Sequence, residues 1–509
     1  MKTYMLASAV ALYTPRLLGA GPDLVVNGSQ TVPGGLYGTI VVKNDGLLRM
    51  NGDVVADTVI CQWGTIEVEG RLTVSGDLTI LGNPNGQMTV RGSNNSCHRI
   101  EVQAGVLNLC GNWSTDQMVV RAGARVQVIP FSRTIPLSGR FEVKCGTFSL
   151  ESAALLDATA CGSDSRGQGG GSGPGGGGYG GAGGKAFWGD SVGGRVYGDA
   201  HSLSIQMGSA GGSLGGGSIA VLADEELMVS GEIRASGGRT AGGGGSGGGV
   251  LLYGQLVNIR GKISANGGNG VDGEYHGGGG GGRIKVFYST GVDSAELSKL
   301  SVQGGQGGWR AVSGGAGTVW VDAIPLAPAL IAPSDGVVIL EGKPVLRFRV
   351  LDTSNQTDNR PDDLCGVIEI STNRFASVLR RYSQAITLSG WSSVSYRSGD
   401  EAQFSVQEQL PPGSYQWRAI VQDRSVPGPN SEVRSFSVAE PLKINHVRAL
   451  GNDVQIEWSG GSAPYQLQKR TTLTTGEWTK VGEDTSSRSA KDSADASTGF
   501  YRVVCFQQN

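Results

Sequence analysis

Short runs of alternating apolar and polar residues fill residues 38–161, a pattern that predicts β-strands with one buried face. Six units repeat here, and each contains an alternating run, a glycine and a second alternating run. The shared glycines stand at spacings of 18 to 23 residues, at Gly46, Gly64, Gly86, Gly105, Gly123 and Gly146. Strands that repeat at such intervals, with glycine where the backbone turns sharply, predict the coils of a parallel β-solenoid.

A solenoid stacks each strand on the equivalent strand of the next coil. The pattern therefore predicts two inward ladders, one of Ile100, Met118 and Phe141 and one of Val102, Val120 and Val143. An antiparallel meander within a sandwich is the alternative. It explains the alternation but not the repeated position of the glycine, so the solenoid is favoured.

A second repeat follows in residues 162–322, where most of the 86 glycines lie. The stretches GGGSIAVLA, GGGVLLYGQ, GGRIKVFYS and GAGTVWVDA place Ile219, Leu251, Ile284 and Val319 at equivalent positions, and EIRASGG, GKISANGG and LSVQGGQGG recur between them. Each unit thus holds two strands and one glycine tract. Collagen is excluded because there is no Gly-X-Y period and almost no proline.

The glycine tracts recur at one phase of this repeat, so they are expected to lie side by side. In composition and phase they resemble the polyglycine-II bundles of some phage tail-tip adhesins and of springtail antifreeze proteins, although no Gly-X-X period supports an antifreeze role. Glycine lets backbones approach closely and keeps its N–H for lateral hydrogen bonds. Ordering each glycine costs about 1–2 kcal/mol of backbone entropy, so ordered packing and mobile loops remain the two alternatives.

Beyond Asp322 the composition changes, and AIPLAPALIAPSDG predicts a linker into short alternating runs typical of antiparallel sandwiches. The stretch LPPGSYQWRAIVQD resembles the penultimate strand of fibronectin type III modules, which implies a tyrosine corner at Tyr415 and a core position for Trp417. The last 69 residues resemble a smaller fibronectin-like module common at the C-termini of large exported bacterial proteins. Its expected core is Trp458, Tyr465, Leu467, Trp478 and Tyr501.

The N-terminus resembles a secretory signal, with Lys2, an apolar run from Tyr4 to Tyr13, and Gly19 and Ala20 before a polar exit. No later segment reaches the roughly 18 apolar residues of a membrane span. The predicted organisation is a signal peptide at 1–20, a β-solenoid of about six coils at 21–161, a glycine-rich section at 162–322, and two sandwich modules at 323–440 and 441–509. The predicted fold class is all-β.

Seven cysteines, Cys61, Cys97, Cys110, Cys145, Cys161, Cys365 and Cys505, are too widely spaced for a zinc motif. Export would permit disulfides, with Cys97–Cys110 and Cys145–Cys161 as the nearest pairs. Buried, reduced thiols explain the odd number and the wide scatter equally well.

Charge and polar motifs give little indication of nucleic-acid binding, catalysis or metal binding. Charged residues make up 17% of the chain and the net charge is -2, which argues against a nucleic-acid partner. The four histidines, His98, His201, His276 and His446, fall in different modules, and no catalytic residue or cofactor is predicted. GGNGVDGEY from Gly267 is a single imperfect copy of a calcium-binding nonapeptide, interpreted as an ordinary loop. Weak calcium candidates are Asp352, Asp358, Asp362 and Asp363 in one loop, where a solvated acidic loop is the favoured interpretation.

Together these patterns predict a secreted, noncatalytic adhesion or scaffolding protein of a bacterial cell surface or matrix, with a polysaccharide or protein partner. The alternatives are a solenoid-type polysaccharide-binding protein or polysaccharide-degrading enzyme, and a subunit of a homopolymeric filament. Residues 21–37 are too short and too rich in glycine and proline for a helix that would cap the first coil. Self-association through this end of the solenoid is a further hypothesis.

Overall fold

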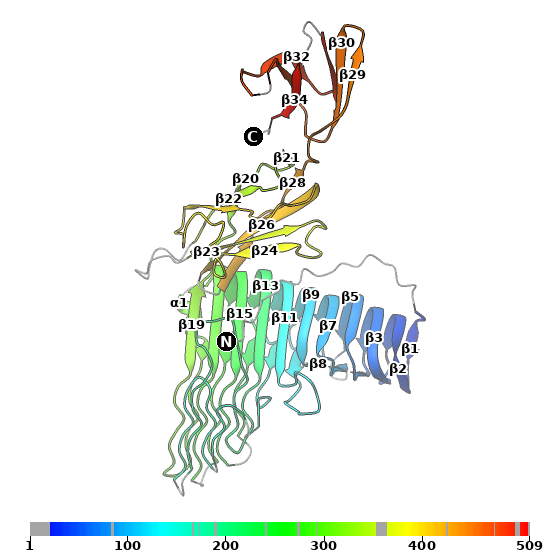
Figure 1. Ribbon diagram of the computed structural model, residues 1–509. Coiled ribbons are helices and arrows are strands. Elements are labelled where there is room, and N and C mark those ends of the chain that lie inside the picture. The colour runs from blue at the N-terminus through cyan, green and yellow to red at the C-terminus, as the bar shows by residue number, and fades with distance from the viewer. Residues whose placement is uncertain are drawn as a thin grey trace. The chain divides into compact units, whose positions relative to one another are not determined.

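The computed structural model describes residues 21–82, 86–164, 167–172, 174–187, 191–239, 242–271, 275–292, 294–352, 364–423, 426–472, 474–493 and 499–506 (Figure 1). The chain divides into two compact units after Ile324. No helix in these ranges is long and apolar enough to cross a membrane. The described part of the chain is all-β, as predicted, apart from one helical turn, α1 (Ser294–Leu297).

The first unit is a parallel β-solenoid whose strands join one sheet of 19 strands within the described residues. Its long strands pair coil to coil, and every pairing is parallel. They are β2 (Ser29–Val42), β3 (Leu47–Gln62), β5 (Leu72–Leu81), β7 (Asn94–Val102), β9 (Gly111–Val120), β11 (Arg140–Leu150), β13 (Ser218–Val229), β15 (Gly249–Ile259), β17 (Arg283–Thr290) and β19 (Thr318–Ala323).

Short strands form a second parallel ladder that starts against the first part of β3. They are β4 (Thr65–Val68), β6 (Gln87–Val90), β8 (Val106–Leu109), β10 (Arg125–Val128), β12 (Leu155–Asp157), β14 (Glu232–Arg234), β16 (Lys262–Ser264) and β18 (Leu300–Ser301). In the first coil, β1 (Leu24–Val26) pairs with Ile40–Val42 of β2. One apolar core runs between the two ladders.

The inward ladders confirm the predicted pairing of Ile100 with Met118 and of Val102 with Val120. The predicted third members were wrong, because Met118 pairs with Phe148 and Val120 with Leu150. Phe141 and Val143 lie earlier in β11, opposite Gly111 and Trp113. The error arose in the sixth unit, where the predicted turn residue Gly146 lies inside β11 and residue 153 makes the turn instead.

Some of the turns between long and short strands have left-handed backbone geometry. Gly105 and Gly123 adopt φ values of 82° and 79°, and Ala153 takes the equivalent position in the next coil with φ 63°. Glycine reaches this region without steric cost. Close approach of neighbouring coils requires glycine at other turns, because a Cβ at Gly64 would lie 2.7 Å from the carbonyl oxygen of Gly46.

Four glycine-rich segments leave the solenoid between a short strand and the following long strand. They comprise residues 158–217, 235–248, 265–282 and 302–317, and we call them together the glycine bundle. Figure 1 shows these segments running side by side away from the sheet. Each of the last three joins a predicted strand pair, which confirms that one repeat unit contains two strands and one glycine tract.

Hydrogen bonds join the segments of the glycine bundle laterally. Gly280 donates to the carbonyl of Gly177 at 2.8 Å and Gly281 to that of Gly315 at 2.9 Å, while Gly279 donates to Gly268 at 2.9 Å within its own segment. Three successive N–H groups thus bond in three directions, as expected of an extended helix with three residues per turn. These lateral bonds agree with ordered packing of the glycine tracts, one of the two alternatives that the sequence left open.

The second unit contains two antiparallel sandwiches. The first pairs β20 (Ala329–Ala332), β22 (Val345–Arg349) and β25 (Glu401–Ser405) in one sheet. Its other sheet contains β21 (Val337–Ile339), β23 (Leu364–Ser371), β24 (Arg380–Ser383), β26 (Gly413–Asp423), β27 (Val426–Asn430) and β28 (Arg434–Val438). Trp417 is fully buried, and the Tyr415 hydroxyl donates to the Pro411 carbonyl at 2.8 Å. Both expectations for the penultimate strand, β26, are confirmed.

The second sandwich has two three-stranded sheets, β29 (Lys443–Leu450), β30 (Asp453–Ser459) and β33 (Ser489–Ser493), and β31 (Tyr465–Arg470), β32 (Thr479–Thr485) and β34 (Phe500–Cys505). Trp458, Tyr465 and Leu467 form its core as predicted, with Tyr501 packed against them. The prediction was wrong for Trp478, whose ring lies between two guanidinium groups, with the Cζ atoms of Arg470 and Arg502 each 4.5 Å from its centroid.

Candidate functional site

An aromatic cluster lies at the turns of three segments of the glycine bundle, and we call it the bundle tip. It consists of Phe187, Tyr275, Trp309 and Arg310. The ring centroids of Phe187 and Tyr275 are 5.4 Å apart in a stacked arrangement, and those of Tyr275 and Trp309 are 5.3 Å apart, edge to face. The Arg310 guanidinium carbon lies 4.4 Å from the Trp309 ring centroid and 5.5 Å from that of Phe187.

Backbone hydrogen bonds between the segments bring these side chains together. The Phe187 N–H donates to the Tyr275 carbonyl at 3.0 Å, and the Gly308 N–H donates to the His276 carbonyl at 2.9 Å. Arg310 adopts a left-handed φ of 59° at the turn of the last segment. The cluster is therefore assembled from three separate turns whose positions are fixed by the lateral bonding of the bundle.

The bundle tip presents apolar surface to solvent. Trp309 is 54% exposed, Val312 beside it is 56% exposed, and Phe187 is 39% exposed. Exposed aromatic rings with an arginine beside them combine a large apolar contact area with hydrogen-bond donors, the combination that dominates the binding energy of many interfaces. The arrangement can hold the apolar face of a sugar ring or of a protein side chain.

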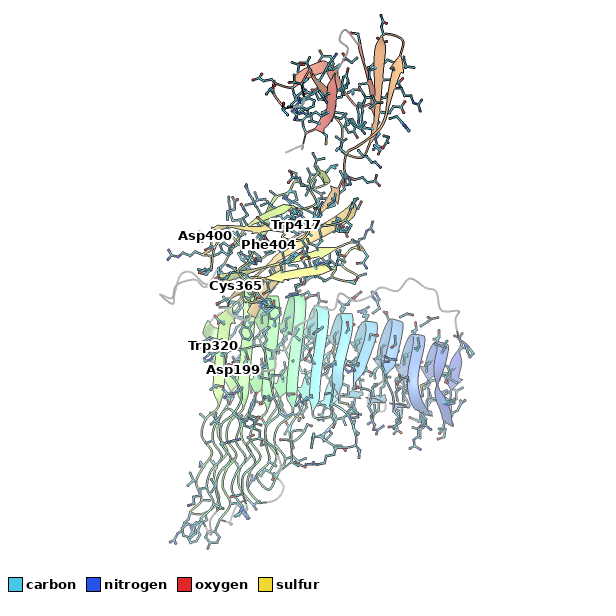
Figure 2. The ribbon with its side chains drawn as sticks, viewed as in Figure 1. Asp199, Trp320, Cys365, Asp400, Phe404 and Trp417 are labelled. Atoms are coloured by element: carbon cyan, nitrogen blue, oxygen red, sulfur yellow. The ribbon has the colours of Figure 1, made fainter. Side chains whose placement is uncertain are left out.

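The first segment of the bundle is fastened to the outer face of β17 by two buried cations. The Lys285 ammonium donates to the carbonyls of Asp199, Ser202 and Ser204 at 2.6 to 2.7 Å, and Figure 2 labels Asp199 beside the long strands. Arg283 donates to the Tyr197 carbonyl at 2.9 Å. Burial lowers the pKa of Lys285 to about 8. These contacts hold the later part of the first segment, residues 197–204, against β17.

The histidines do not converge on one site. His98 in β7 contacts Asp116 in β9, with 2.9 Å between Nδ1 and Oδ2. His201 packs edge to face on Trp320 with centroids 4.1 Å apart. His276 belongs to the glycine bundle and His446 to β29. The structure thus assembles no histidine-based catalytic set from these four residues.

The calcium candidates are divided by the limits of the described residues. Asp352 lies inside them, whereas Asp358, Asp362 and Asp363 lie outside. Among the described residues, no group of three or more His, Cys, Asp or Glu side chains is placed to hold a metal ion. The stretch from Gly267 resembling a calcium nonapeptide also falls partly outside, and its described glycines are part of the bundle.

The five solenoid cysteines are unbridged and buried. Burial raises the pKa of the Cys61 and Cys110 thiols to about 11, and of the Cys97, Cys145 and Cys161 thiols to about 12. A thiol that stays protonated is a poor nucleophile. These residues act as small apolar core residues, which agrees with the thiol interpretation and not with the Cys97–Cys110 and Cys145–Cys161 disulfides.

Sequence reasoning did not single out the bundle tip, although a signal for it exists. The stretches KAFWG, GEYHG and GGWRAV each place aromatic residues within otherwise glycine-rich sequence. An aromatic residue inside such a tract has no sheet to pack on, so it is a candidate for exposure. That three of them meet depends on how far each segment runs before it turns.

Comparisons with known proteins give limited similarity. No protein-family model matches the chain, and no curated protein matches it. Among solved structures, the FN1–FN3 domains of chicken CNTN1 are similar at 14% identity and a TM-score of 0.21, covering 35% of this chain and 59% of that one. Domains A168–A170 of titin are similar at 16% identity and a TM-score of 0.20, covering 39% and 65%. The chain thus spans less than two thirds of each of these structures.

Proposed function

We propose that this is a noncatalytic extracellular adhesion or scaffolding protein of a cell surface or matrix, which binds a polysaccharide or a protein through the bundle tip. The observation that carries the proposal is the cluster of Phe187, Tyr275, Trp309 and Arg310 at the turns of the bundle. The laterally bonded segments hold this surface away from the sheet. The solenoid anchors the segments at equivalent positions of successive coils, so that they lie side by side.

A noncatalytic role is supported by the state of the nucleophiles and bases. The solenoid thiols are buried and protonated, and the histidines lie in different parts of the chain. The secreted location is proposed from the signal-like N-terminus, whose residues 1–20 lie outside the described part. A polysaccharide-degrading enzyme is the competing function, and it is distinguished by turnover: release of new reducing or unsaturated ends during binding assays would favour it.

Replacing Trp309 with alanine is expected to weaken ligand binding by about 10- to 100-fold, because truncation of a central aromatic residue of an interface commonly costs about 2 kcal/mol or more. The measurement is binding of the full chain to immobilised neutral and acidic polysaccharides and matrix proteins, with Kd determined for each surface that retains the wild type.

Trp63 provides the matched control, since it is 55% exposed against 54% for Trp309 and lies on the solenoid. Its replacement with alanine removes the same amount of exposed indole from another place, and binding should stay within twofold. Equal affinities of the Trp309→Ala variant and the wild type for every retained surface would contradict a role of the bundle tip.

A further inference from the structure

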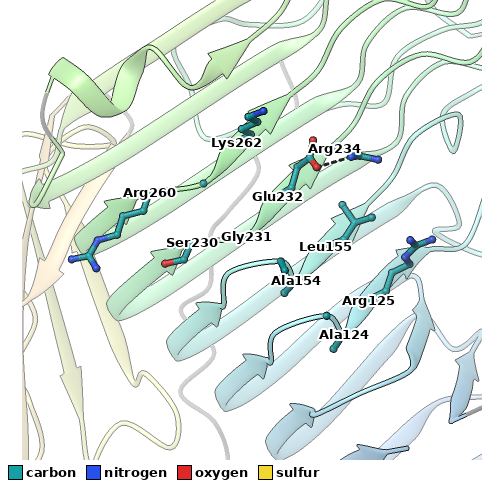
Figure 3. Close-up of a pocket in the computed structure, with 13 residues that line it drawn as sticks. Ala124, Arg125, Ala154, Leu155, Ser230, Gly231, Glu232, Arg234, Arg260 and Lys262 are labelled. Atoms are coloured by element: carbon teal, nitrogen blue, oxygen red, sulfur yellow. Dashed lines mark hydrogen bonds and ion pairs between the residues drawn. The ribbon is translucent and has the colours of Figure 1, made fainter. Parts of the chain in front are cut away.

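A trough crosses the flank of the solenoid at the turns of four successive coils (Figure 3). It has a volume of about 520 Å³ and lies where the long strands turn into β10, β12, β14 and β16. Its floor consists of small residues: Gly123, Ala124, Ala153, Ala154, Gly231 and Gly261. The trough is thus separate from the bundle tip and belongs to the coiled part of the unit.

The stacking of the coils keeps this floor small. A Cβ atom at Gly261 would lie 1.7 Å from the carbonyl oxygen of Gly231, and one at Gly231 would lie 2.4 Å from that of Ala154. Real Cβ atoms do not approach backbone oxygens so closely, so side chains cannot fill the hollow from these two positions. The trough is a built-in feature of the coil register.

Three charged side chains and Leu155, at one register position of successive short strands, form one wall of the trough. Arg125 pairs with Leu155, Leu155 with Glu232, and Glu232 with Lys262 along the ladder of short strands. Figure 3 shows these residues on successive strands, with Arg260 on the neighbouring turn. At about 4.8 Å per coil, Arg125 and Lys262 are separated by roughly 14 Å along the solenoid axis.

The charge of the trough is predominantly positive. Arg125, Arg234, Arg260 and Lys262 line it together with a single carboxylate, Glu232. That carboxylate is already bonded by Arg234, whose Nη2 lies 2.6 Å from Oε2. The other three cations have no ion-pair partner among the residues that the structure describes. Lys299 adds a further ammonium beside them, since it donates to the Arg260 carbonyl at 3.0 Å.

We propose that this trough binds an extended carboxylated polysaccharide. The unpaired cations at the two ends of the trough, Arg125 at one end and Arg260 with Lys262 at the other, can bond carboxylates of sugar residues that lie some distance apart along one chain. Arginine can bond a carboxylate through two N–H groups. The shallow floor of small residues leaves room for a chain lying along the solenoid axis. This is a second binding site, separate from the bundle tip, and its ligand is anionic.

The charge density of the trough favours such a chain over nucleic acid. Duplex DNA carries one negative charge per about 1.7 Å of axis, and its binding requires a correspondingly dense set of cations. Here three unpaired cations extend over three coil steps, next to a carboxylate and within a chain of net charge -2. A polymer with about one charge per sugar fits this sparse pattern.

The test is binding of the full chain to polygalacturonate, with fully methyl-esterified polygalacturonate as the uncharged form of the same backbone. We expect retention of the acidic form only, weakening as salt rises, because exposed charge contacts are screened. The variant R260E/K262E should bind at least about tenfold more weakly, since two attractions become repulsions. Arg125→Glu, at the other end of the trough, should weaken binding in the same direction.

Lys443→Glu in β29 is the matched control, because it reverses an exposed charge in the other unit and should leave affinity within twofold. Absence of salt-sensitive binding, wild-type affinity of correctly folded R260E/K262E, or tighter binding of single-stranded DNA than of polygalacturonate would each overturn the proposal.

Discussion

Replacing Gly279 with alanine is expected to lower the free energy of unfolding of the glycine bundle by at least about 2 kcal/mol, an overpacking cost. A Cβ atom at this position would lie 2.0 Å from the carbonyl oxygen of Gly245 and 2.5 Å from its carbonyl carbon. Relief requires that the two segments separate. Separation of segment 265–282 from segment 235–248 would break the bond that Gly268 donates to the Gly245 carbonyl at 2.8 Å and the bond that Gly244 donates to the Gly277 carbonyl at 2.9 Å.

Hydrogen exchange of the full chain measures this effect locally. Amides of residues 235–248 and 265–282 should exchange faster in the variant, while those of β5 and β7 should be unchanged. Gly315→Ala is the control, because a Cβ there has its nearest neighbours at 3.5 and 3.6 Å, an ordinary contact. Similar exchange in both variants would mean that close backbone packing does not hold the bundle together.

The solenoid could be predicted because each coil repeats the same physical requirement. Alternation marks one buried face, and glycine marks turns that are left-handed or that approach a neighbouring backbone closely, so the coils appear as a period in the sequence. The register failed in the sixth unit for a local reason. Residues 129–139 insert a loop between β10 and β11, and Gly146 lies within a strand while Ala153 adopts the left-handed turn.

The predicted register of the glycine-rich repeat was wrong by one residue in one strand, β15. Leu251 was predicted to lie opposite Ile219, but Ile219 pairs with Val250, and Val250 pairs with Ile284. Both Val250 and Leu251 are buried, because the first segment of the bundle covers the outer face of these strands. Alternation disappears where both faces of a strand are buried, so the sequence alone could not fix the phase.

The bundle tip and the trough could not be derived from the pattern for different reasons. The tip depends on the lengths of three separate segments, which composition does not reveal. The trough depends on which residues of distant coils share a register position, such as Leu155 and Glu232, which are 77 residues apart in the sequence. Because residues 158–217 leave the sheet as a bundle segment, Leu155 and Glu232 become neighbours in adjacent coils.

In the first sandwich, replacing Glu369 with glutamine is expected to lower the free energy of unfolding of that module by about 3 to 5 kcal/mol, the cost of removing one partner from a buried ion pair. The Glu369 side chain is fully buried between Arg381 and Arg418. Arg418 is itself only 7% exposed, with its Nε 2.8 Å from Oε2 of Glu369, and its guanidinium carbon lies 4.3 Å from the Phe375 ring centroid. Glutamine keeps the shape but leaves the Arg418 charge buried and uncompensated.

Glu401→Gln separates this effect from the loss of any carboxylate on the same sandwich. Glu401 pairs with Arg347 at 2.6 Å, but the two side chains are 43% and 40% exposed, so water replaces the lost partner and the cost should stay below about 1 kcal/mol. The free energy of unfolding of this sandwich is measured for both variants by denaturant unfolding of the full chain, with hydrogen exchange of the β23 and β26 amides as the readout. An equally small effect of the two substitutions would show that the Glu369 pair contributes no more than a surface ion pair, and that packing around Trp417 and Phe404 holds the sheets together without it.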